Sequence, residues 1–210
     1  VSKVHRVPTF TDLYYSSKTE MGNVNLVPEN AVSAEVGYQF QKSGILAKAS
    51  GFMRNSNNAI DWVKNSLQDP IWYAQNVGEI DTKGVEFEVN HQIFSFLKYS
   101  LGYTYLDTEF TQSNQFVSRY VLDNLKHQVV AKLQIKFLKY FTKEFVYRYN
   151  DRVNLGSYNV LDEKLSFNKK DFSVYVLVNN VTDSKYTETF GVPMPQRWFH
   201  IGFTYNINIK

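Results

Sequence analysis

The chain has 210 residues and a formal net charge of +3, and 16% of its residues are aromatic. Its lysines and arginines are dispersed, so no basic patch favours nucleic acid as a partner, and the absence of cysteine excludes disulfides and Cys-based metal sites. No run of about 18 apolar residues occurs, which excludes a transmembrane helix. A β-barrel in lipid is compatible with this composition, because its strands are only half apolar and aromatic girdles line both membrane interfaces.

The first predicted elements are a strand over residues 1–5 and a long polar and aromatic connection over residues 6–30. The connection begins extended, because a residue before proline, here Val7, is pushed toward β geometry. Glycine, asparagine and proline residues then punctuate the chain before a new strand at Ala31. A strand, a long loop and a strand form the pattern of an up-and-down β-barrel.

Further along the chain, apolar and polar residues alternate with a period of two over residues 85–91, 97–105, 129–137 and 199–209. Such alternation indicates a strand with two different faces. The polar faces consist of small, hydrophilic residues, as expected of a wet lumen. A soluble, lipocalin-like binder would need an apolar interior and a polar exterior, so these faces argue against that alternative.

Strand signals along the whole chain predict about ten strands, with no helix and no domain boundary. We place the strands at residues 1–5, 31–41, 44–57, 73–91, 95–110, 126–137, 140–151, 156–168, 171–181 and 197–209. Short turns fall near residues 42–43, 93–94, 138–139 and 169–170. Long connections fall at residues 6–30, 58–72, 111–125 and 182–196. Short turns at one end and long loops at the other are typical of an all-β, antiparallel up-and-down transmembrane β-barrel.

Several short motifs occur in a fixed order along these elements. They are Arg6-Val7-Pro8, Asp12-Leu13-Tyr14-Tyr15, the stretch from Gly22 to Glu29, Glu35-Val36-Gly37-Tyr38, Ile60-Asp61-Trp62, Asn76, Thr82-Lys83-Gly84-Val85-Glu86, Val178-Asn179-Asn180 with Asp183 and Tyr186, and Pro195 with Arg197. Over nearly the whole chain they resemble the TonB-dependent outer-membrane receptors, and within that family the vitamin B12 receptors of the Bacteroides type. The chain departs from the family at Gln196, which replaces a glycine, and at Asn208-Ile209-Lys210, which extend past the usual terminal aromatic position.

The resemblance implies that residues 1–210 are the C-terminal portion of a larger barrel of about 22 strands, without its plug domain and first barrel half. The implied function is TonB-energised uptake of a scarce, bulky nutrient across the outer membrane of a Gram-negative bacterium. Cobalamin is the favoured ligand, and a ferric siderophore or haem is the alternative. The implied partners are outer-membrane lipid, the TonB complex acting through the missing plug, and a surface lipoprotein. The resemblance implies no enzymatic activity, no cofactor and no bound metal.

A cut barrel has two unpaired edges, here at the first strand and at residues 199–209. Unpaired edge strands are templates for association. We therefore expect the isolated piece to close on itself, to pair with a second copy or to be completed by another chain.

Aromatic side chains gather in and beside the long loops, where a ligand would be caught. Aromatic residues with few charges suit a bulky, partly apolar ligand, because they offer a large contact area at little entropy cost. We predict ligand contacts for Tyr14, Tyr15, Trp62, Phe116, Tyr120 and Phe190. The alternative for each is a place in the aromatic girdle at the membrane interface.

Charged residues on the strands are predicted to line the lumen and to pair across it. They are Asp81, Glu86, Glu88, Lys48, Lys98, Lys132, Lys136 and Arg148. The histidines show no metal-ligand spacing. An outer-membrane barrel hydrolase, the alternative of another class, needs paired aspartates and an Asp–His pair at the outer rim. Asp81 and Asp107 are the candidate aspartates, but His127 and His5 have no evident carboxylate partner.

Overall fold

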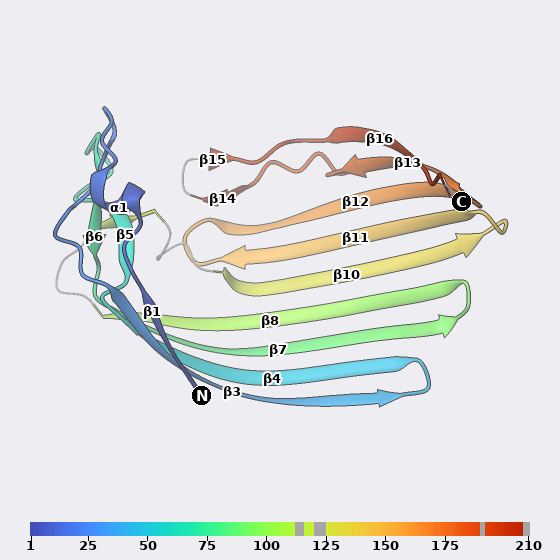
Figure 1. Ribbon diagram of the computed structural model, residues 1–210, viewed down its shortest axis with the longest axis horizontal. Helices are drawn as coiled ribbons and strands as arrows, with labels where there is room; N and C mark the ends of the chain where they lie inside the picture. Colours follow the sequence, from blue (N-terminus) through green and yellow to red (C-terminus); the bar gives the residue numbers. More distant parts are fainter. Residues whose placement is uncertain (112–115, 120–124, 190–191, 208–210) are drawn as a thin grey trace.

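The computed structural model describes residues 1–111, 116–119, 125–189 and 192–207. Its main body is one antiparallel sheet of ten strands (Figure 1). In spatial order these strands are β1 (Ser2–Arg6), β3 (Glu29–Lys42), β4 (Ile45–Asn57), β7 (Glu79–Phe94), β8 (Leu97–Thr111), β10 (Leu125–Phe137), β11 (Phe141–Arg152), β12 (Gly156–Lys169), β13 (Phe172–Asn179) and β16 (Trp198–Tyr205). Each of them pairs with the strands that precede and follow it in this sheet along the chain. The predicted up-and-down antiparallel architecture is therefore confirmed.

The two ends of this sheet differ in their connections. Tight turns join the strands at one end, on the right of Figure 1. Several residues of these turns adopt positive φ, namely Ser43, Gly44, Leu138, Lys139 and Lys170. The long connections lie at the opposite end and form further secondary structure there (Figure 1). We call this opposite end the loop end of the sheet.

One face of the sheet is apolar and exposed. The strand register places Val36, Val85 and Tyr105 in one row across β3, β4, β7 and β8. Large side chains on this face remain uncovered; for example, Val36 is 77% exposed and Ile201 is 78% exposed. Water-soluble proteins rarely leave so broad an apolar surface open, whereas a membrane barrel presents such a surface to lipid. We call this surface the apolar face.

The opposite, polar face carries most of the charged residues that were predicted to line the lumen. The register sets Lys48, Glu88, Gly102, Val130 and Arg148 in one row. The Lys48 ammonium lies 3.5 Å from the Glu88 carboxylate. Farther along the sheet, Arg148 of β11 lies 2.7 Å from Asp162 of the adjacent strand β12. Both ion pairs join adjacent strands along the polar face.

Asp81 lies on the other face, so its predicted place beside Glu86 and Glu88 is wrong. Side chains alternate along a strand, and position 86 lies five positions, an odd number, after position 81 in β7. The register pairs Asp81 with Asn55 and Glu109. The Asn55 amide donates to the Asp81 carboxylate at 2.9 Å.

An ion pair also lies on the apolar face. The Lys143 ammonium lies 2.6 Å from the Glu163 carboxylate, and each side chain is only about a quarter exposed. Glu163 stands in register between Phe145 and Val178, and Val178 pairs in turn with the exposed Phe199. The two charges thus neutralise each other within apolar surroundings.

The predicted strand over residues 73–91 is wrong in one respect, because two elements occupy this range. Residues Trp72–Asn76 form β6 in a second sheet, and β7 begins only at Glu79. Gly78 separates them with a φ of +115°, and a Cβ at this position would lie 2.8 Å from the carbonyl oxygen of Thr111. Only glycine accommodates both the angle and the approach.

The long loops at the loop end fold into a small subdomain instead of irregular chain. A helix, α1 (Phe10–Tyr14), precedes a four-stranded sheet that contains β2 (Glu20–Met21), β6, β5 (Ile60–Lys64) and β9 (Val117–Ser118). The prediction of no helix is therefore wrong for α1. Two short strands, β14 (Thr187–Thr189) and β15 (Val192–Pro193), pair with each other elsewhere at this end. We call α1 and the four-stranded sheet the loop subdomain.

Among the described residues, no helix has the length and apolarity required to cross a membrane.

The loop subdomain has its own apolar core. Leu26, Ile60, Trp62, Trp72 and Ala74 are each at most 8% exposed and pack together. Leu26 comes from the connection before β3, the other four come from the connection between β4 and β7, and Val117 from a third connection packs against them. Such long-range packing holds the loops as one rigid unit, because the core would be lost if any one of them moved away.

Asp12 joins the helix to this core. The Thr9 hydroxyl accepts from the Asp12 backbone N–H at 3.1 Å, while the Asp12 carboxylate accepts from the Thr9 backbone N–H at 3.0 Å. This capping box begins α1. The same carboxylate lies 3.3 Å from the Arg6 guanidinium and accepts from the Trp62 indole at 3.3 Å. Arg6 and Asp12, from the Arg-Val-Pro and Asp-Leu motifs, therefore belong to one network of contacts that links α1 to the core.

Gly22, Asn23 and Asn76 close the first loop. A Cβ at Gly22 would lie 2.9 Å from the Asp12 carbonyl oxygen, so the chain passes α1 too closely for any side chain. The Asn23 backbone N–H donates to that carbonyl at 2.8 Å. The Asn76 side chain accepts from the Val27 N–H and donates to the Val27 carbonyl, both at 2.9 Å. These residues of the family motifs therefore fix the path of the loop backbone.

We predict that Asp12→Ala loosens the loop subdomain without unfolding the main sheet. The change removes a helix cap and leaves Arg6 and the Trp62 N–H without their shared carboxylate, which costs about 2–4 kcal/mol. Hydrogen exchange should therefore accelerate at the Leu13 and Asn23 amides, whereas Asp107→Ala, at an exposed position, should change nothing. Unchanged exchange in the Asp12 variant would contradict this assignment.

We also predict that loss of one partner of the Lys143–Glu163 ion pair lowers stability, whereas replacement of both partners does not. In lipid, Lys143→Ala or Glu163→Ala leaves one unpaired charge on the apolar face, at a cost of about 2–4 kcal/mol. The double variant Lys143→Leu with Glu163→Leu should unfold near the wild-type temperature in lipid vesicles. Lys132→Ala on the polar face is the control, and equal effects of the single and double variants would refute the prediction.

Candidate functional site

Exposed aromatic side chains gather on α1 at the loop end. Tyr14 is 57% exposed and Tyr15 is 45% exposed. Phe10, at 79% exposure, lies one helical turn before Tyr14, and their ring centroids are 5.0 Å apart. Sequence reasoning missed Phe10. The capping box at Thr9 and Asp12 was the available signal, since it starts a helix that places residues four apart on one side.

The other predicted ligand residues have different surroundings. Trp62 is 8% exposed, with its indole bound to Asp12 and packed in the core of the loop subdomain. Phe116 is half-buried against a second cluster of Ala59, Val63 and Val77 and contacts Phe110. Both side chains therefore serve packing first. Tyr120 and Phe190 lie outside the described residues.

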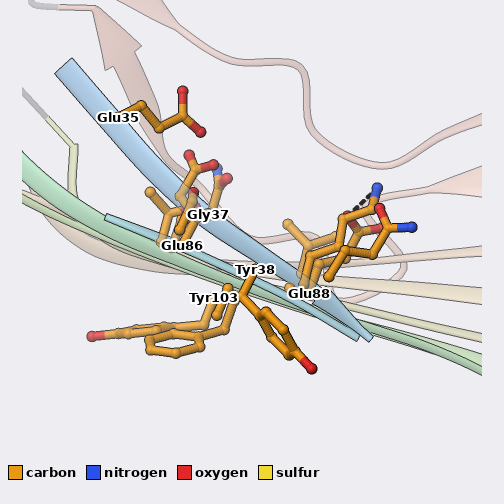
Figure 2. Close-up of a pocket in the computed structure, with 15 residues that line it drawn as sticks. Glu35, Gly37, Tyr38, Glu86, Glu88 and Tyr103 are labelled. Carbon is orange, nitrogen blue, oxygen red and sulfur yellow. Dashed lines mark hydrogen bonds and ion pairs between the residues drawn. The ribbon is translucent and has the colours of Figure 1, made fainter. Parts of the chain in front are cut away.

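A hollow of about 590 Å³ lies on the polar face of the sheet (Figure 2). Glu35, Glu86, Glu88 and Lys48 surround it, and Gly37 and Gly102 leave its floor without side chains. Tyr38 and Tyr103 also border it, but their rings lie on the opposite side of the strands from Glu35 in Figure 2 and belong to the apolar face. We call this hollow the polar-face recess.

A second hollow of about 450 Å³ lies at the loop end of β12, between this strand and the chain around β14 and β15. It is lined by Leu155, Tyr158, Lys185, Tyr186, Met194 and Gln196. The rings of Tyr158 and Tyr186 are stacked, with centroids 4.4 Å apart and an interplanar angle of 24°. The Tyr158 hydroxyl donates to the Glu188 carboxylate at 2.6 Å. We call this hollow the mouth recess.

The Tyr186 phenol is uncharged at physiological pH, because the pKa of an unperturbed tyrosine is already about 10. Burial raises the pKa of its phenol above the ordinary value, and the Glu188 carboxylate adds to the rise. The ring therefore offers an uncharged, partly apolar surface at physiological pH.

A turn over residues 180–184 fixes Tyr186. Asn180 is 2% exposed and adopts a φ of +50°. Its amide donates to the Ser184 carbonyl at 2.8 Å and accepts from the Ser184 N–H at 2.9 Å. The Asn180 backbone N–H donates to Asp162 at 2.8 Å, and Asp162 is itself paired with Arg148. The Asn-Asn motif thus anchors the turn that carries Tyr186.

The histidines and aspartates form no hydrolytic arrangement among the described residues. His127 shares a hydrogen bond of 2.9 Å with the Tyr103 hydroxyl, not with a carboxylate. Asp61, 1% exposed, accepts from the Trp62 N–H at 2.7 Å and from the Ser118 hydroxyl. In the part of the chain that the structure describes, no group of three or more His, Cys, Asp or Glu residues could hold a metal ion.

Curated proteins with similar sequences include vitamin B12 transporters named BtuB. The one from Vibrio cholerae serotype O1, strain O395, is 25% identical over 202 residues, which cover 92% of this chain and 32% of the relative. The one from Vibrio vulnificus strain YJ016 is 31% identical over 83 residues, covering 40% of this chain and 13% of the relative. The chain thus spans about a third of the length of its V. cholerae relative.

Solved structures share the fold. The copper transporter OprC superposes with a TM-score of 0.74 at 16% identity, over 97% of this chain and 36% of that chain. The siderophore receptor PirA from Pseudomonas aeruginosa gives a TM-score of 0.69 at 18% identity, over 97% of this chain and 35% of that one. The family model described as "TonB dependent receptor-like, beta-barrel" matches residues 1–181. Since that match covers most of the chain, the chain belongs to the TonB-dependent receptor β-barrel family.

Proposed function

We propose that the chain is the C-terminal part of an outer-membrane receptor that takes up a scarce, bulky nutrient, with cobalamin as the favoured ligand. The observation that carries this proposal is the exposed aromatic group of Phe10, Tyr14 and Tyr15 on a rigid subdomain at the loop end. Rigid aromatic side chains bind large, partly apolar ligands at a small entropy cost. The ligand is moved and not chemically altered.

Two features support a place in the outer membrane of a Gram-negative bacterium. The broad exposed apolar face suits contact with lipid, and the polar face suits a wet, plugged lumen. In the complete receptor a plug domain and a first barrel half precede this chain, and the TonB complex acts through the plug. A surface lipoprotein that delivers the ligand would contact the loop end.

The ligand preference rests on similarity and charge. The relatives named for vitamin B12 transport align with most of this chain, whereas neighbours named for siderophores and iron share the fold at lower identity. Around the polar-face recess, Glu35, Glu86 and Glu88 stand with Lys48. This mixed charge favours a ligand with little net charge over an anionic ferric siderophore, which is the second candidate.

Binding of labelled cobalamin to the complete receptor tests the proposal. We expect the wild-type receptor to bind cobalamin, and Tyr14→Ala to weaken binding by about tenfold, because an exposed aromatic anchor contributes about 1–2 kcal/mol. Tyr147→Ala is the control, since Tyr147 is an exposed tyrosine on the apolar face and lines neither the polar-face recess nor the mouth recess. If the receptor binds ferric siderophores and no cobalamin, the favoured ligand is wrong and the second candidate takes its place.

The open edges of the sheet generate a separate prediction. Among the described residues, β1 pairs only with β3, and β16 pairs only with β13. Unpaired strand edges are not tolerated in lipid, so the chain by itself should close, dimerise or take up another chain. Cross-linking of the isolated chain in detergent should show edge-to-edge contacts of β16; a stable monomer with both edges open would disprove this.

A further inference from the structure

We propose that the mouth recess is a second contact site for the transported ligand and binds a flat, uncharged, partly apolar portion of it. This inference rests on the proposed function and adds a site on the ten-stranded sheet, apart from Phe10, Tyr14 and Tyr15 of the loop subdomain. The predicted ligand residues at the sequence level did not include Tyr158, Lys185 or Met194.

The position of the recess places it on the ligand's path. Tyr158 pairs in register with Asn150, and Asn150 pairs with Gln128, which lines the polar-face recess. The Tyr158 side chain therefore stands on the polar face, two residues from the start of β12 at the loop end. Figure 1 shows β14 and β15 at this same end. A ligand that passes from outside toward the polar face meets the stacked rings.

The recess is held open by contacts beneath and beside it. Tyr158 is fixed through its hydroxyl to Glu188, and the Met194 N–H donates to the Tyr186 carbonyl at 2.9 Å. The buried Asn180 turn fixes the chain just before Lys185 and Tyr186. A site that is already ordered loses little conformational entropy when a ligand enters.

The lining determines the chemical class of ligand. The Tyr186 ring, Leu155 and Met194 supply an apolar surface for one flat face of a ligand. Lys185 and Gln196 are exposed at the rim and can donate hydrogen bonds to carbonyl or amide oxygens on its periphery. The recess therefore suits a macrocycle or fused ring system that carries neutral oxygen acceptors.

The test uses the complete receptor and labelled cobalamin. Tyr186→Ala should weaken binding by about tenfold, whereas Tyr186→Phe, which keeps the ring, should bind as the wild type does. Gln196→Trp should also weaken binding, because the indole fills the recess while the tyrosines and the Asn180 turn stay intact. Equal amounts of folded receptor in the membrane are required for each variant, and Tyr147→Ala is the control.

The outcomes separate the two proposals. If the wild type binds cobalamin and both Tyr186→Ala and Gln196→Trp bind it equally well, the mouth recess is not a ligand site, and the proposed function stands. If Tyr186→Ala fails to assemble, the Gln196→Trp result decides alone. If the wild type binds no cobalamin, cobalamin is not the ligand, and the assignment of the mouth recess as its contact site is overturned as well.

Discussion

Backbone pairing between neighbouring strands is the constraint on which the whole structure depends. The ladder of hydrogen bonds fixes a register across ten strands, and the register decides which side chains share a face. A shift of one residue would move every side chain of a strand to the other face. The Lys48–Glu88 pair, the glycine floor of the polar-face recess and the exposed apolar face are three results of this one register.

The loop end depends on the sheet but adds its own packing. Strand ends bring three loops close together, and their apolar residues then bury one another around Trp62 and Trp72. Asp12 connects this core to α1 and to Arg6. As a result, the exposed aromatic residues Phe10, Tyr14 and Tyr15 are held in place by the helix and the core beneath it. Preorganisation of this kind lets a loop bind a large ligand without ordering itself first.

The strands were predictable because alternation is a local property. Each strand shows its two faces in its own residues, so residues 97–105 and 129–137 could be identified without knowledge of their neighbours. The same rule, applied strictly, would have separated Asp81 from Glu86. The single turn of α1 was missed, because so short a helix depends on its capping box and on the contact between Asp12 and Trp62, fifty positions apart.

The candidate site was less predictable than the fold. Trp62 was predicted to contact the ligand, whereas it is buried by residues that are distant from it in the sequence. The stacking of Tyr158 on Tyr186 likewise joins two distant segments, and neither residue alone indicates a recess. Aromatic residues in loops therefore indicated a binding surface in general but did not tell a core residue from an exposed one.

The sequence by itself determined the class of sheet, the order of its strands and the end at which its loops gather, because these follow from period-two alternation and turn residues. Its motifs between Arg6 and Glu29 also carried the family resemblance, and the structure shows that they hold backbone geometry. Only the tertiary structure decided which loop aromatics are buried and which are open. Burial depends on contacts between residues far apart in the chain, and such contacts exist only after the strands have paired.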